Sequence, residues 1–346
     1  MSNIKKYIPA IAAVLMVVIG LAISNSQTSK PEQYKAGYID VFDTVTEFLG
    51  YDSSEEEFKT KAKLLNDELL VYHQLYDIYN EYDGINNLKT INNNAGIAPV
   101  VVDSKIIDLI KFSKDVYEKT DGEINIAMGS VLSIWHNYRS YGKELPPIED
   151  LKEAAKHCDI NNIIIDETAS TVYLADPEMS LDVGSIGKGY AVQMVAEHAR
   201  NCGYDNMVIN CGGNVAAIGT KPDDTNWKFG IQNPDLKASN NLLKTVSFAD
   251  RCLVTSGDYQ RYYVVDGVEY CHIIDPDTLM PANYFKSVSI ITNHSGLADA
   301  LSTALFNMPY EDGLTLINSI EDAEAIWVFE DGSIHYSDNF EKYISE

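Results

Sequence analysis

The segment from Met179 to Asn214 combines charged side chains with glycine-rich turns at a spacing that suits a phosphate-bearing ligand. Just before a predicted helix it carries one acid, Asp182, and one base, Lys188, among a serine and three glycines: Gly184, Ser185, Gly187 and Gly189. Glycines let the backbone approach a ligand closely, and the start of a helix offers unpaired N–H groups. The alternative is that these glycines serve only a tight turn from a strand into the helix.

Two common nucleotide-binding patterns do not fit this segment. A Walker A loop requires GxxxxGK[ST], whereas here Gly189 follows Lys188 and Asp182 occupies the place of the first glycine. A dinucleotide fingerprint requires GxGxxG, but Gly187 and Gly189 are followed by Tyr190–Val192. The segment contains neither motif.

A carboxylate and a hydroxyl share one face of the helix predicted over Leu297–Met308. Asp299 and Thr303 are four residues apart and therefore lie one turn from each other, while leucines and a methionine cover the packing side. Oxygen ligands of this kind suit a hard cation. The alternative is structural: Asp299 would interact with the helix dipole, and Thr303 would bond to its own backbone in the core.

One histidine, His272, ends a predicted strand at the turn Cys271–Pro276. Near neutral pH it could act as a base or bind phosphate, although a single histidine at a strand end also fits a purely structural role. A second corner, Thr255–Tyr259, offers hydroxyls and the carboxylate of Asp258, which fits a simple turn residue equally well.

The elements that must position these residues follow from periodicity and turn signals. Helices are expected over about twenty residues from Glu55, over Ser104–Lys119 and Ile148–His157, from Ile186 to near Gly203, and over Leu297–Met308 and Leu314–Ser319. Strands are expected around Phe42–Thr44, just before Gly184, and over Ile163–Asp166, Thr171–Ala175, Asn206–Cys211, Lys228–Gln232, Thr245–Ala249, Leu253–Ser256, Tyr262–Asp266, Val268–Ile274, Ser287–Thr292, Ala325–Glu330 and Ser333–Tyr336. Gly84–Pro99 is predicted to be a loop, and Gly122–Trp135 shows no clear period. Helices mixed with antiparallel hairpins indicate an α+β fold.

The formal net charge of −25 limits the ligands that the domain can bind. It argues against nucleic acid and against docking of the domain on an anionic membrane surface. A protein this acidic that held a polyphosphate would need a metal cation to offset the charge.

The N-terminus has the pattern of an export signal. Lys5 and Lys6 precede a nearly unbroken apolar run from Tyr7 to Ile23, and a polar stretch follows. This pattern is typical of a signal peptide or short signal anchor over residues 1–24, rather than of a buried core helix. We therefore expect an exported protein at the extracytoplasmic face of the membrane, either anchored or secreted.

The rest of the chain is expected to form a linker over residues 25–36 and a single elaborated domain over residues 37–346. No internal repeat or low-complexity region divides that domain. Its five cysteines are odd in number and lack CxxC spacing, which favours buried small residues over a disulfide framework or a metal site. A single disulfide is still compatible with the sequence.

Six ordered blocks of the sequence resemble the ApbE family, the FAD:protein FMN transferases: DVGSIGKGYA, NCGGN, WKFGIQNP, VTSGDYQRYY, HIIDPDTLMP and ADALSTALF. Two earlier blocks, FDT at Phe42–Thr44 and TDGEINIA at Thr120–Ala127, match more loosely. The resemblance extends from Tyr38 to the C-terminus, and six blocks in order are specific where any one alone is not. It implies a T-fold-related arrangement of helices and antiparallel sheets in one catalytic domain.

The resemblance also implies an activity. FAD would be the donor substrate, Mg²⁺ would bind its diphosphate, and FMN would be transferred to a Thr or Ser hydroxyl of a partner flavoprotein, with release of AMP. Carried over block by block, it implies FAD contacts at Asp182 and Lys188, flavin contacts at Phe42, Gly122, Glu123, Ile124 and Ile274, metal contacts at Ser185, Asp299, Ser302 and Thr303, and His272 as the base for the acceptor hydroxyl. This agrees with the general needs of phosphoryl transfer, which are charge neutralisation and an activated attacking oxygen.

Two departures from the family pattern affect these expectations. Leu279 stands where DPxTGxP has glycine, so the turn after Asp275 is expected to differ, with consequences for acceptor specificity. The chain also lacks the lipobox cysteine of many members, so its anchoring is expected to differ. Two other functions stay open at this point: an FAD diphosphatase that uses water as the acceptor, and an exported flavin-binding protein without turnover.

Overall fold

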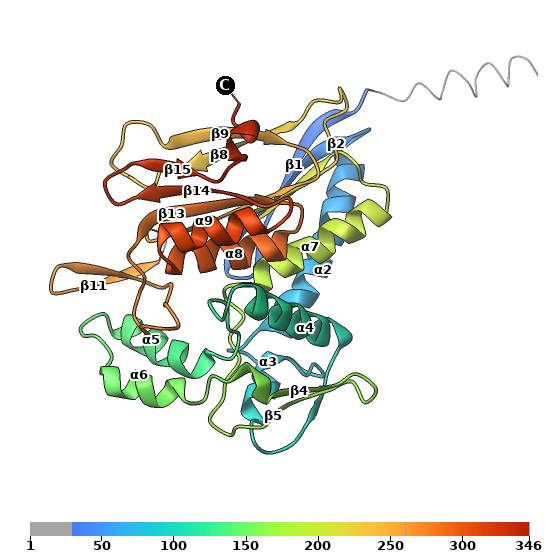
Figure 1. The fold of residues 1–346 in the computed structure, drawn as a ribbon. Helices are drawn as coiled ribbons and strands as arrows, with labels where there is room; N and C mark the ends of the chain where they lie inside the picture. The colour runs from blue at the N-terminus through green and yellow to red at the C-terminus, as the bar shows by residue number, and fades with distance from the viewer. Residues whose placement is uncertain (1–29, 260, 346) are drawn as a thin grey trace, which may run out of the picture.

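An eight-stranded antiparallel sheet forms the centre of the computed structural model, which describes residues 30–259 and 261–345 (Figure 1). The strand order is β1-β2-β6-β7-β10-β13-β14-β15. The bounds of these strands are β1 Glu32–Val41, β2 Thr44–Asp52, β6 Met207–Cys211, β7 Asn214–Ile218, β10 Cys252–Gly257, β13 Phe285–Thr292, β14 Glu324–Phe329 and β15 Ile334–Tyr336. Neighbouring strands in this order are antiparallel throughout.

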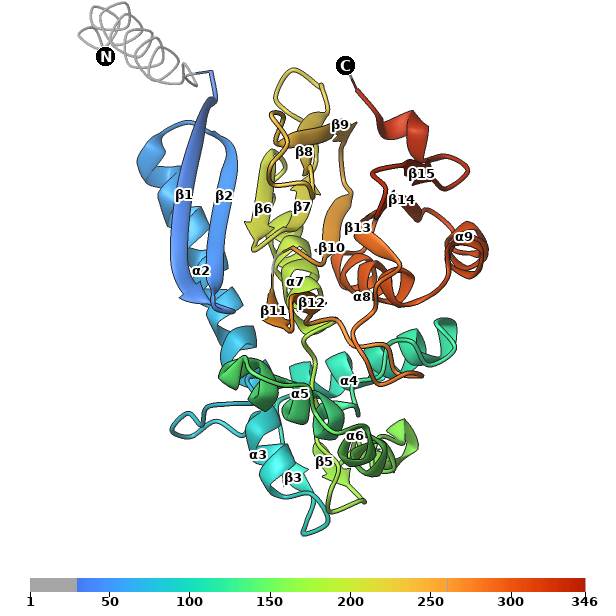
Figure 2. The same ribbon diagram turned by 90° about the vertical axis from the view of Figure 1, so that its left-hand side faces the viewer.

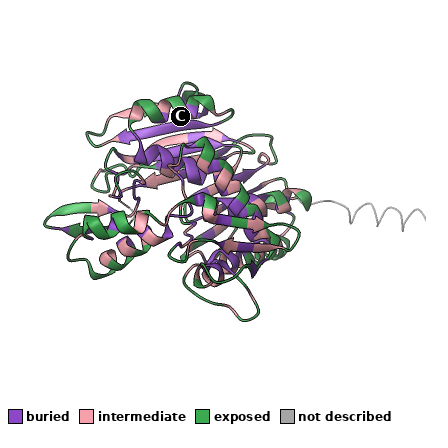
Figure 3. Cartoon of the chain, turned by 60° about the horizontal axis from the view of Figure 1, so that its bottom comes forward, coloured by how far each residue is buried: buried purple, intermediate pink, exposed green. Residues whose placement is uncertain are grey.

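Other elements pack against both faces of the central sheet, while most of the edge strand β1 stays exposed. Helices α2 (Glu55–Tyr76), α7 (Gly187–Asn201), α8 (Ser295–Asn307) and α9 (Tyr310–Ser319) cover one face (Figure 1). The hairpin of β8 (Trp227–Gln232) and β9 (Leu242–Phe248) and the 3₁₀ helix η2 (Phe340–Tyr343) contribute to the cluster on the other face. Side chains alternate between the two faces, so that Ile209 and Val254 join the cluster under the helices while Val208 and Leu253 pack with Trp227. Figure 3 shows the buried residues concentrated along these central layers.

A second group of elements lies below the ends of the central strands (Figure 2). It consists of α3 (Leu88–Asn93), α4 (Ser104–Lys119), α5 (Gly129–Tyr141), α6 (Ile148–Ala155), the 3₁₀ helix η1 (Ile160–Asn162) and a small sheet of β3 (Val100–Val101), β5 (Thr171–Leu174) and β4 (Ile163–Asp166). The hairpin of β11 (Tyr262–Val265) and β12 (Val268–Cys271) packs against α5. Trp135 of α5 contributes to this contact, because its ring lies 6.4 Å from that of Tyr263, measured between centroids. Its ring N–H also donates to the carbonyl of Leu279, in the turn after β12, at 2.9 Å.

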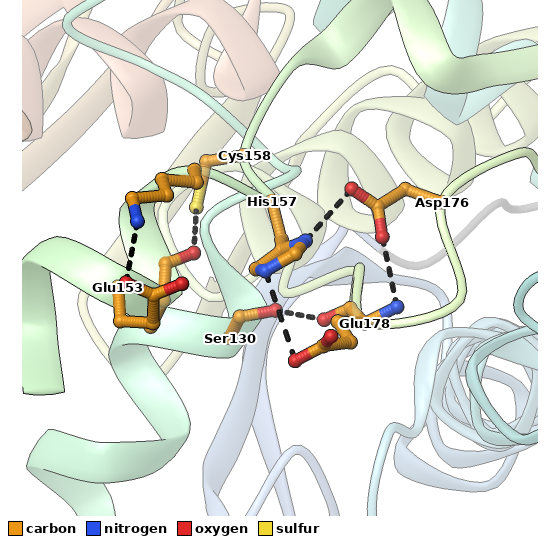
Figure 4. A network of polar contacts seen from close by, with 8 residues as sticks. Ser130, Glu153, His157, Cys158, Asp176 and Glu178 are labelled. Carbon is orange, nitrogen blue, oxygen red and sulfur yellow. Dashed lines mark hydrogen bonds and ion pairs between the residues drawn. The ribbon is translucent and has the colours of Figure 1, made fainter.

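The segment that leads into the glycine-rich turn is tied to α5 and α6 by polar contacts (Figure 4). His157 Nδ1 lies 2.8 Å from a carboxylate oxygen of Asp176, and this hydrogen bond raises the pKa of His157. Ser130 donates to the carbonyl of Glu178 at 2.6 Å. Two backbone bonds continue the connection, from Gly129 to Ser180 and from residue 182 to residue 126, both at 2.9 Å. The start of α5 therefore determines where Asp182 lies.

Most predicted elements are confirmed. The helices over 55–76 and 104–119 begin and end where periodicity and capping indicated, and the side chain of Ser54 caps the first by accepting from the N–H of Glu57. Helices mixed with antiparallel sheets confirm the α+β class. All five cysteines are unpaired, and Cys202 is exposed rather than buried.

Four local predictions were wrong. Phe42 and Asp43 are the two turn residues between β1 and β2, with φ of 52° and 49°, and not the middle of a strand. The loop predicted over 84–99 contains α3, which Asn87 caps with a full capping box. The segment before Gly184 makes only an isolated bridge to Met128 and no regular strand. Strand β1 begins at Glu32, within the segment predicted as linker.

The predicted signal segment over residues 1–24 lies outside the described residues. Within residues 30–259 and 261–345, no helix combines the length and apolar character that a membrane span requires.

We expect Gly129→Ala to destabilise the protein, because the added Cβ would lie 2.4 Å from the carbonyl oxygen of Ser180. Overpacking of this kind costs about 1–3 kcal/mol, which for a chain of this length corresponds to a melting temperature lower by about 1–4 °C. Gly37→Ala in β1 is the control, since its nearest neighbouring atom would be 3.9 Å away. A thermal melt of Gly129→Ala equal to that of the wild type would contradict this contact.

Candidate functional site

The site is built around a close contact between helices α7 and α8. The backbone N–H of Gly189 on α7 donates to Oδ2 of Asp299 on α8 at 2.7 Å. A Cβ at position 189 would lie 2.4 Å from the Cβ of Asp299 and 2.5 Å from the carbonyl oxygen of Ser295. Position 189 therefore has to be glycine for the two helices to meet. This requirement holds whether or not a ligand also approaches the backbone there.

Asp299 is buried, and one half-buried cation lies beside it. Its side chain is about one-tenth exposed or less, and Lys188 Nζ lies 3.8 Å from its Oδ1. With its amide oriented to satisfy both neighbours, Asn214 donates to the same oxygen at 3.2 Å and accepts from Lys188. Burial raises the pKa of Asp299, and Lys188, Gly189 and Asn214 act in the opposite direction. Lys188, Asp299 and Asn214 thus form one polar group at the start of α7.

Asn214 had no assigned role in the sequence, although it ends the block NCGGN. It lies directly after the turn Gly212-Gly213, at the first position of β7. Both glycines have positive φ, 56° and 91°, so this tight hairpin returns the chain towards α7. The turn therefore positions Asn214, which its sequence spacing alone did not indicate.

Hydroxyl groups from two elements meet next to Asp299. Ser256 Oγ of β10 lies 2.8 Å from Ser302 Oγ and 3.4 Å from Thr303 Oγ1, both on α8. Ser302 also donates to the backbone carbonyl of Asp299 at 2.9 Å. Ser185 is half-buried on the turn before α7, and within the described residues its hydroxyl makes no hydrogen bond. The structure thus connects Ser302 and Thr303 to each other through Ser256.

This donor set fits Mg²⁺ better than a softer metal. The described part of the chain contains no group of three or more His, Cys, Asp or Glu that could hold a metal. One buried carboxylate with neighbouring hydroxyls offers only oxygen, the donor that Mg²⁺ prefers, and Mg²⁺ usually completes its shell with water and substrate phosphates. Asp299, Ser302 and Thr303 are therefore residues that could hold it. Ser185 stays a prediction from the family resemblance, since no hydrogen bond among the described residues joins it to these three.

A second part of the site surrounds Asp182. Its Oδ1 accepts from the N–H of Gly184 at 2.8 Å, and burial raises the pKa of this carboxyl group. His136 and the guanidinium of Arg139 act against that rise. Arg139 lies 3.2 Å from His136 Nδ1, and the ring of His136 is 5.5 Å from that of Tyr79, which is 59% exposed.

Tyr79, His136 and Arg139 were missed from the sequence. His136 and Arg139 lie on α5, just after the segment Gly122–Trp135 that shows no clear hydrophobic period, and Tyr79 follows α2 in a loop. The spacing of Arg139, four residues after the buried Trp135, is the one feature that could have placed it on the packed side of a helix.

His272 is held at the end of β12 by the backbone of Arg261. Its N–H and its Nδ1 lie 3.0 Å and 3.2 Å from the carbonyl oxygen of Arg261. A carbonyl only accepts, so Nδ1 carries the proton and Nε2 keeps its lone pair. Burial lowers the pKa of His272 to about 4, and the charges of Arg139, Arg261 and Lys188 act in the same direction. At neutral pH the imidazole is therefore uncharged and able to accept a proton.

The two arginines near His272, Arg139 and Arg261, differ from the other two arginines of the chain in their ion pairs with carboxylates. Arg200 and Arg251 pair with the carboxylates of Asp250 and Asp322. Within the described residues, neither Arg139 nor Arg261 makes an ion pair with a carboxylate. In a protein of charge −25, unpaired guanidinium groups beside a candidate base indicate a place for an anion.

Two of the predicted flavin contacts have side chains that are too buried to touch a ligand. Ile124 is 1% exposed and Ile274 is 7% exposed, so only their backbone groups could contact a ligand. The carbonyl of Ile274 accepts from Asn307 at 3.2 Å. Gly122 has φ of +94°, a conformation that favours glycine.

Phe42 lies at the tip of the β1–β2 hairpin, next to the second glycine turn. Its N–H donates to His73 Nδ1 at 3.2 Å, and the two rings meet edge to face with centroids 5.4 Å apart. The hairpin tip contacts the glycine turn through a backbone bond of 3.1 Å from Gly212 to Val45. A side chain on Gly212 would collide with Thr44, which explains this close approach.

The turn after Asp275 keeps the backbone that a glycine would adopt. Leu279 has φ of +61°, although leucine rarely occupies this region. Its side chain is 8% exposed in a cluster with Trp135, and its carbonyl accepts from the ring of that tryptophan. Packing against α5 thus offsets the backbone strain. The turn was expected to differ without glycine, but Leu279 adopts the φ that a glycine would adopt.

Comparison with known proteins places these features in a family. A model of the ApbE family matches residues 43–327. The chain belongs to the ApbE family. It is 35% identical over 268 residues to the FAD:protein FMN transferase of Treponema pallidum (strain Nichols), covering 72% of each chain. It is 32% identical to the enzyme of the same name from Klebsiella pneumoniae (strain 342), covering 69% of this chain and 73% of that one.

Solved structures of ApbE proteins agree with the fold. The ApbE protein of Thermotoga maritima superimposes with a TM-score of 0.81 at 28% identity, covering 91% of this chain and 100% of the other. The flavin transferase ApbE from Vibrio cholerae gives a TM-score of 0.77 at 22% identity, with coverage of 90% and 99%, and supports the fold alone. The predicted family and fold are confirmed, while the individual roles of the site residues stay predictions.

Glu123 yields a pH-dependent prediction. Burial raises the pKa of this carboxyl group to about 7, and the charges of Asp275, Asp277 and Asp121 act in the same direction. Its Oε2 is buried and has no hydrogen-bond partner among the described residues. A carboxyl group whose pKa is raised on folding favours the folded state at low pH, and this contribution is lost as the pH rises through about 7.

Glu123→Gln should therefore stabilise the protein relative to the wild type more at pH 8 than at pH 5, because glutamine resembles the protonated acid at every pH. The measurement is the melting temperature of both proteins at the two pH values. Glu118→Gln, at an exposed position of α4, is the control and should show the same difference at both pH values. An effect of Glu123→Gln that is independent of pH would rule out the raised pKa.

Proposed function

We propose that the protein is an Mg²⁺-dependent FAD:protein FMN transferase, which moves FMN from FAD to a Thr or Ser hydroxyl of a partner flavoprotein and releases AMP. Membership of the ApbE family and the relatives named above support the coarser part of this proposal, an enzyme that transfers a flavin. One observation carries the finer part. The charge of Lys188, which lies beside the buried carboxylate of Asp299, also acts on the uncharged His272, so the oxygen donors and the candidate base belong to one site.

The donor side of this reaction needs positive charge. The diphosphate of FAD is anionic, and the protein as a whole repels anions with its charge of −25. Lys188, Arg139 and Arg261 are the cations whose charges act on His272, so they would attract the donor to this place. Asp182, fixed by Gly184, would contact FAD as the family pattern implies.

The metal would be held by Asp299, with Ser185, Ser302 and Thr303 as further oxygen donors. Bound Mg²⁺ supplies charge neutralisation at the transferring phosphoryl group. Gly189 keeps one oxygen of Asp299 bonded at 2.7 Å, which fixes the orientation of the carboxylate, and Lys188 lies at its other oxygen. The two helices therefore preorganise the carboxylate before any substrate binds.

On the acceptor side, His272 would act as the general base. Nδ1 donates its proton to the carbonyl of Arg261, so Nε2 is free to take the proton of the acceptor hydroxyl. The hydroxyl oxygen then bonds to the phosphorus of the FMN portion while the bond from that phosphorus to the AMP portion breaks. The proton leaves His272 for solvent after AMP has departed, and no further reactant is needed.

We also propose that the protein works outside the cytoplasm, because the sequence of residues 1–24 has the pattern of a signal peptide or anchor. Its partners would be FAD and an acceptor flavoprotein in that compartment, with no nucleic acid. The membrane would be contacted only through the N-terminal segment.

The metal assignment is tested by Asp299→Asn, which keeps the size of the side chain and removes its charge. AMP release from FAD, measured against Mg²⁺ concentration, should fall by about a hundredfold or more, since a metal ion contributes several kcal/mol to such a transition state. Glu324→Gln is the matched control, because Glu324, at the start of β14, is also a buried carboxylate. It accepts from Ser337 and forms an ion pair with Lys342. Wild-type Mg²⁺-dependent turnover in Asp299→Asn would remove this assignment.

The base is tested by the pH dependence of transfer and by His272→Ala. With a pKa of about 4, His272 stays unprotonated as the pH falls from 8 to about 5, so transfer should persist and then fall as the pH passes through about 4. His272→Ala should slow transfer about 10²–10⁴-fold while FAD binding stays intact. His198→Ala on α7 is the control, since His198 is more exposed and pairs with Glu68.

The same assay separates transfer from the two other functions. The wild type is incubated with FAD and Mg²⁺, with and without an acceptor protein, and AMP, free FMN and acceptor-bound flavin fluorescence are measured. AMP with labelled acceptor supports transfer, AMP with free FMN alone indicates an FAD diphosphatase, and no product at all indicates a binding protein. Loss of FAD binding in His272→Ala would make His272 a ligand contact instead of the base.

A further inference from the structure

The hairpin of β11 and β12 has one open edge. It forms a separate two-stranded sheet, in which Tyr262 pairs with Cys271 and Val265 with Val268. The N–H of His272 bonds to the carbonyl of Arg261, so these two residues form a hydrogen-bonded pair of the antiparallel ladder. Every second pair is then bonded across the hairpin, so the backbone groups of Tyr262 and Val264 point away from β12.

These outward groups have no partner within the described residues, in which no hydrogen bond reaches the backbone of Tyr262 or Val264. Their side chains are also exposed, to 45% and 46%. The alternate residues Tyr263 and Val265 are each only 8% exposed, because they pack with Trp135 of α5. β11 is therefore anchored on one face and open along its edge and its other face.

This open edge runs beside the candidate base. Arg261 directly precedes β11, and His272 directly follows β12 and bonds to Arg261 across the ladder. A third strand along β11 would lie two strand spacings from β12, about 10 Å from its axis. Two or three extended residues cover that distance, so a segment that continues past Arg261 would come to His272.

We propose that β11 binds an extended segment of the acceptor protein as a third strand, which delivers the acceptor hydroxyl to His272. This inference rests on the proposed transfer reaction. A hydroxyl of another protein can reach His272 only if backbone of that protein lies against the neighbouring residues. The free backbone groups of Tyr262 and Val264 can bond to such a segment whatever its sequence, and their side chains contact its alternate residues.

A second exposed apolar face serves as a comparison. The outer face of the small sheet carries Val101, which is 61% exposed, and Ile164, which is 50% exposed. These strands belong to the group of elements below the central sheet (Figure 2), and no candidate catalytic residue lies on them. This face therefore offers equally exposed β-branched positions without a place in the proposed reaction.

The test uses Val264→Pro, which removes one outward N–H and obstructs the edge without breaking a bond to β12. Val264→Thr is the matched control, because it keeps the N–H and the shape of the side chain. Val101→Thr is the control on the remote face. The probe is a flavoprotein domain chosen because the full-length wild-type enzyme labels it with FMN, detected by covalently bound fluorescence.

We expect Val264→Pro to lower kcat/KM for this acceptor about tenfold or more through a higher KM, as expected for the loss of one backbone hydrogen bond together with the obstruction of the edge. AMP release from FAD without acceptor should stay unchanged in Val264→Pro, and both threonine variants should label the acceptor like the wild type. A wild-type KM for the acceptor in Val264→Pro would overturn the proposal.

Two further results would also overturn it. Equal losses of acceptor-free and acceptor-dependent turnover in Val264→Pro would mean damage to the site rather than to docking. Conversion of a dimeric wild type into a monomer by Val264→Pro, measured by light scattering, would mean that a second copy of the chain occupies the edge. If the wild type labels no acceptor at all, the proposed transfer reaction fails instead, which separates the two inferences.

Discussion

The contact between Gly189 and Asp299 is the constraint on which the site depends. Burying a carboxylate is costly unless hydrogen bonds and an opposite charge compensate it. Here the backbone of α7 supplies one hydrogen bond at 2.7 Å, and Lys188 supplies the charge at 3.8 Å. Because any Cβ at position 189 would collide with α8, this compensation requires glycine. The same constraint places Asn214 and the hydroxyls of α8 next to Asp299, and thereby determines the chemistry of the site.

Charge separates the site from the rest of the molecule. The protein carries a net charge of −25, yet three cations act on His272, and two of them are guanidinium groups without a carboxylate partner among the described residues. An acidic protein in general excludes anions, so a local cationic group concentrates an anionic substrate at one place. Burial lowers the pKa of His272 and the same cations act in the same direction, so the imidazole stays uncharged at neutral pH, which suits a base. These three cations therefore act both on an anionic substrate and on the protonation state of His272.

The sequence predicted the elements whose signals are local. The helix over 104–119 has a strong period and an Asp103 cap, and the spacing of Asp299 and Thr303 needed only helix geometry. The strand around Phe42 was wrong because a phenylalanine with positive φ is unusual, so nothing marked it as a turn residue. Arg139 could not be assigned, since its position near His272 depends on how Trp135 docks α5 onto the β11–β12 hairpin. Residues brought together by tertiary packing were the ones that pattern alone did not reveal.

The proposed reaction requires a divalent cation between α7 and α8 at the carboxylate of Asp299. The most direct measurement is anomalous diffraction from a crystal of the protein grown with FAD and Mn²⁺, which replaces Mg²⁺ at oxygen sites. We predict an anomalous peak within about 2.5 Å of a carboxylate oxygen of Asp299 and in contact with the diphosphate of FAD. A peak at any other place, or bound FAD without a cation at Asp299, would contradict the account.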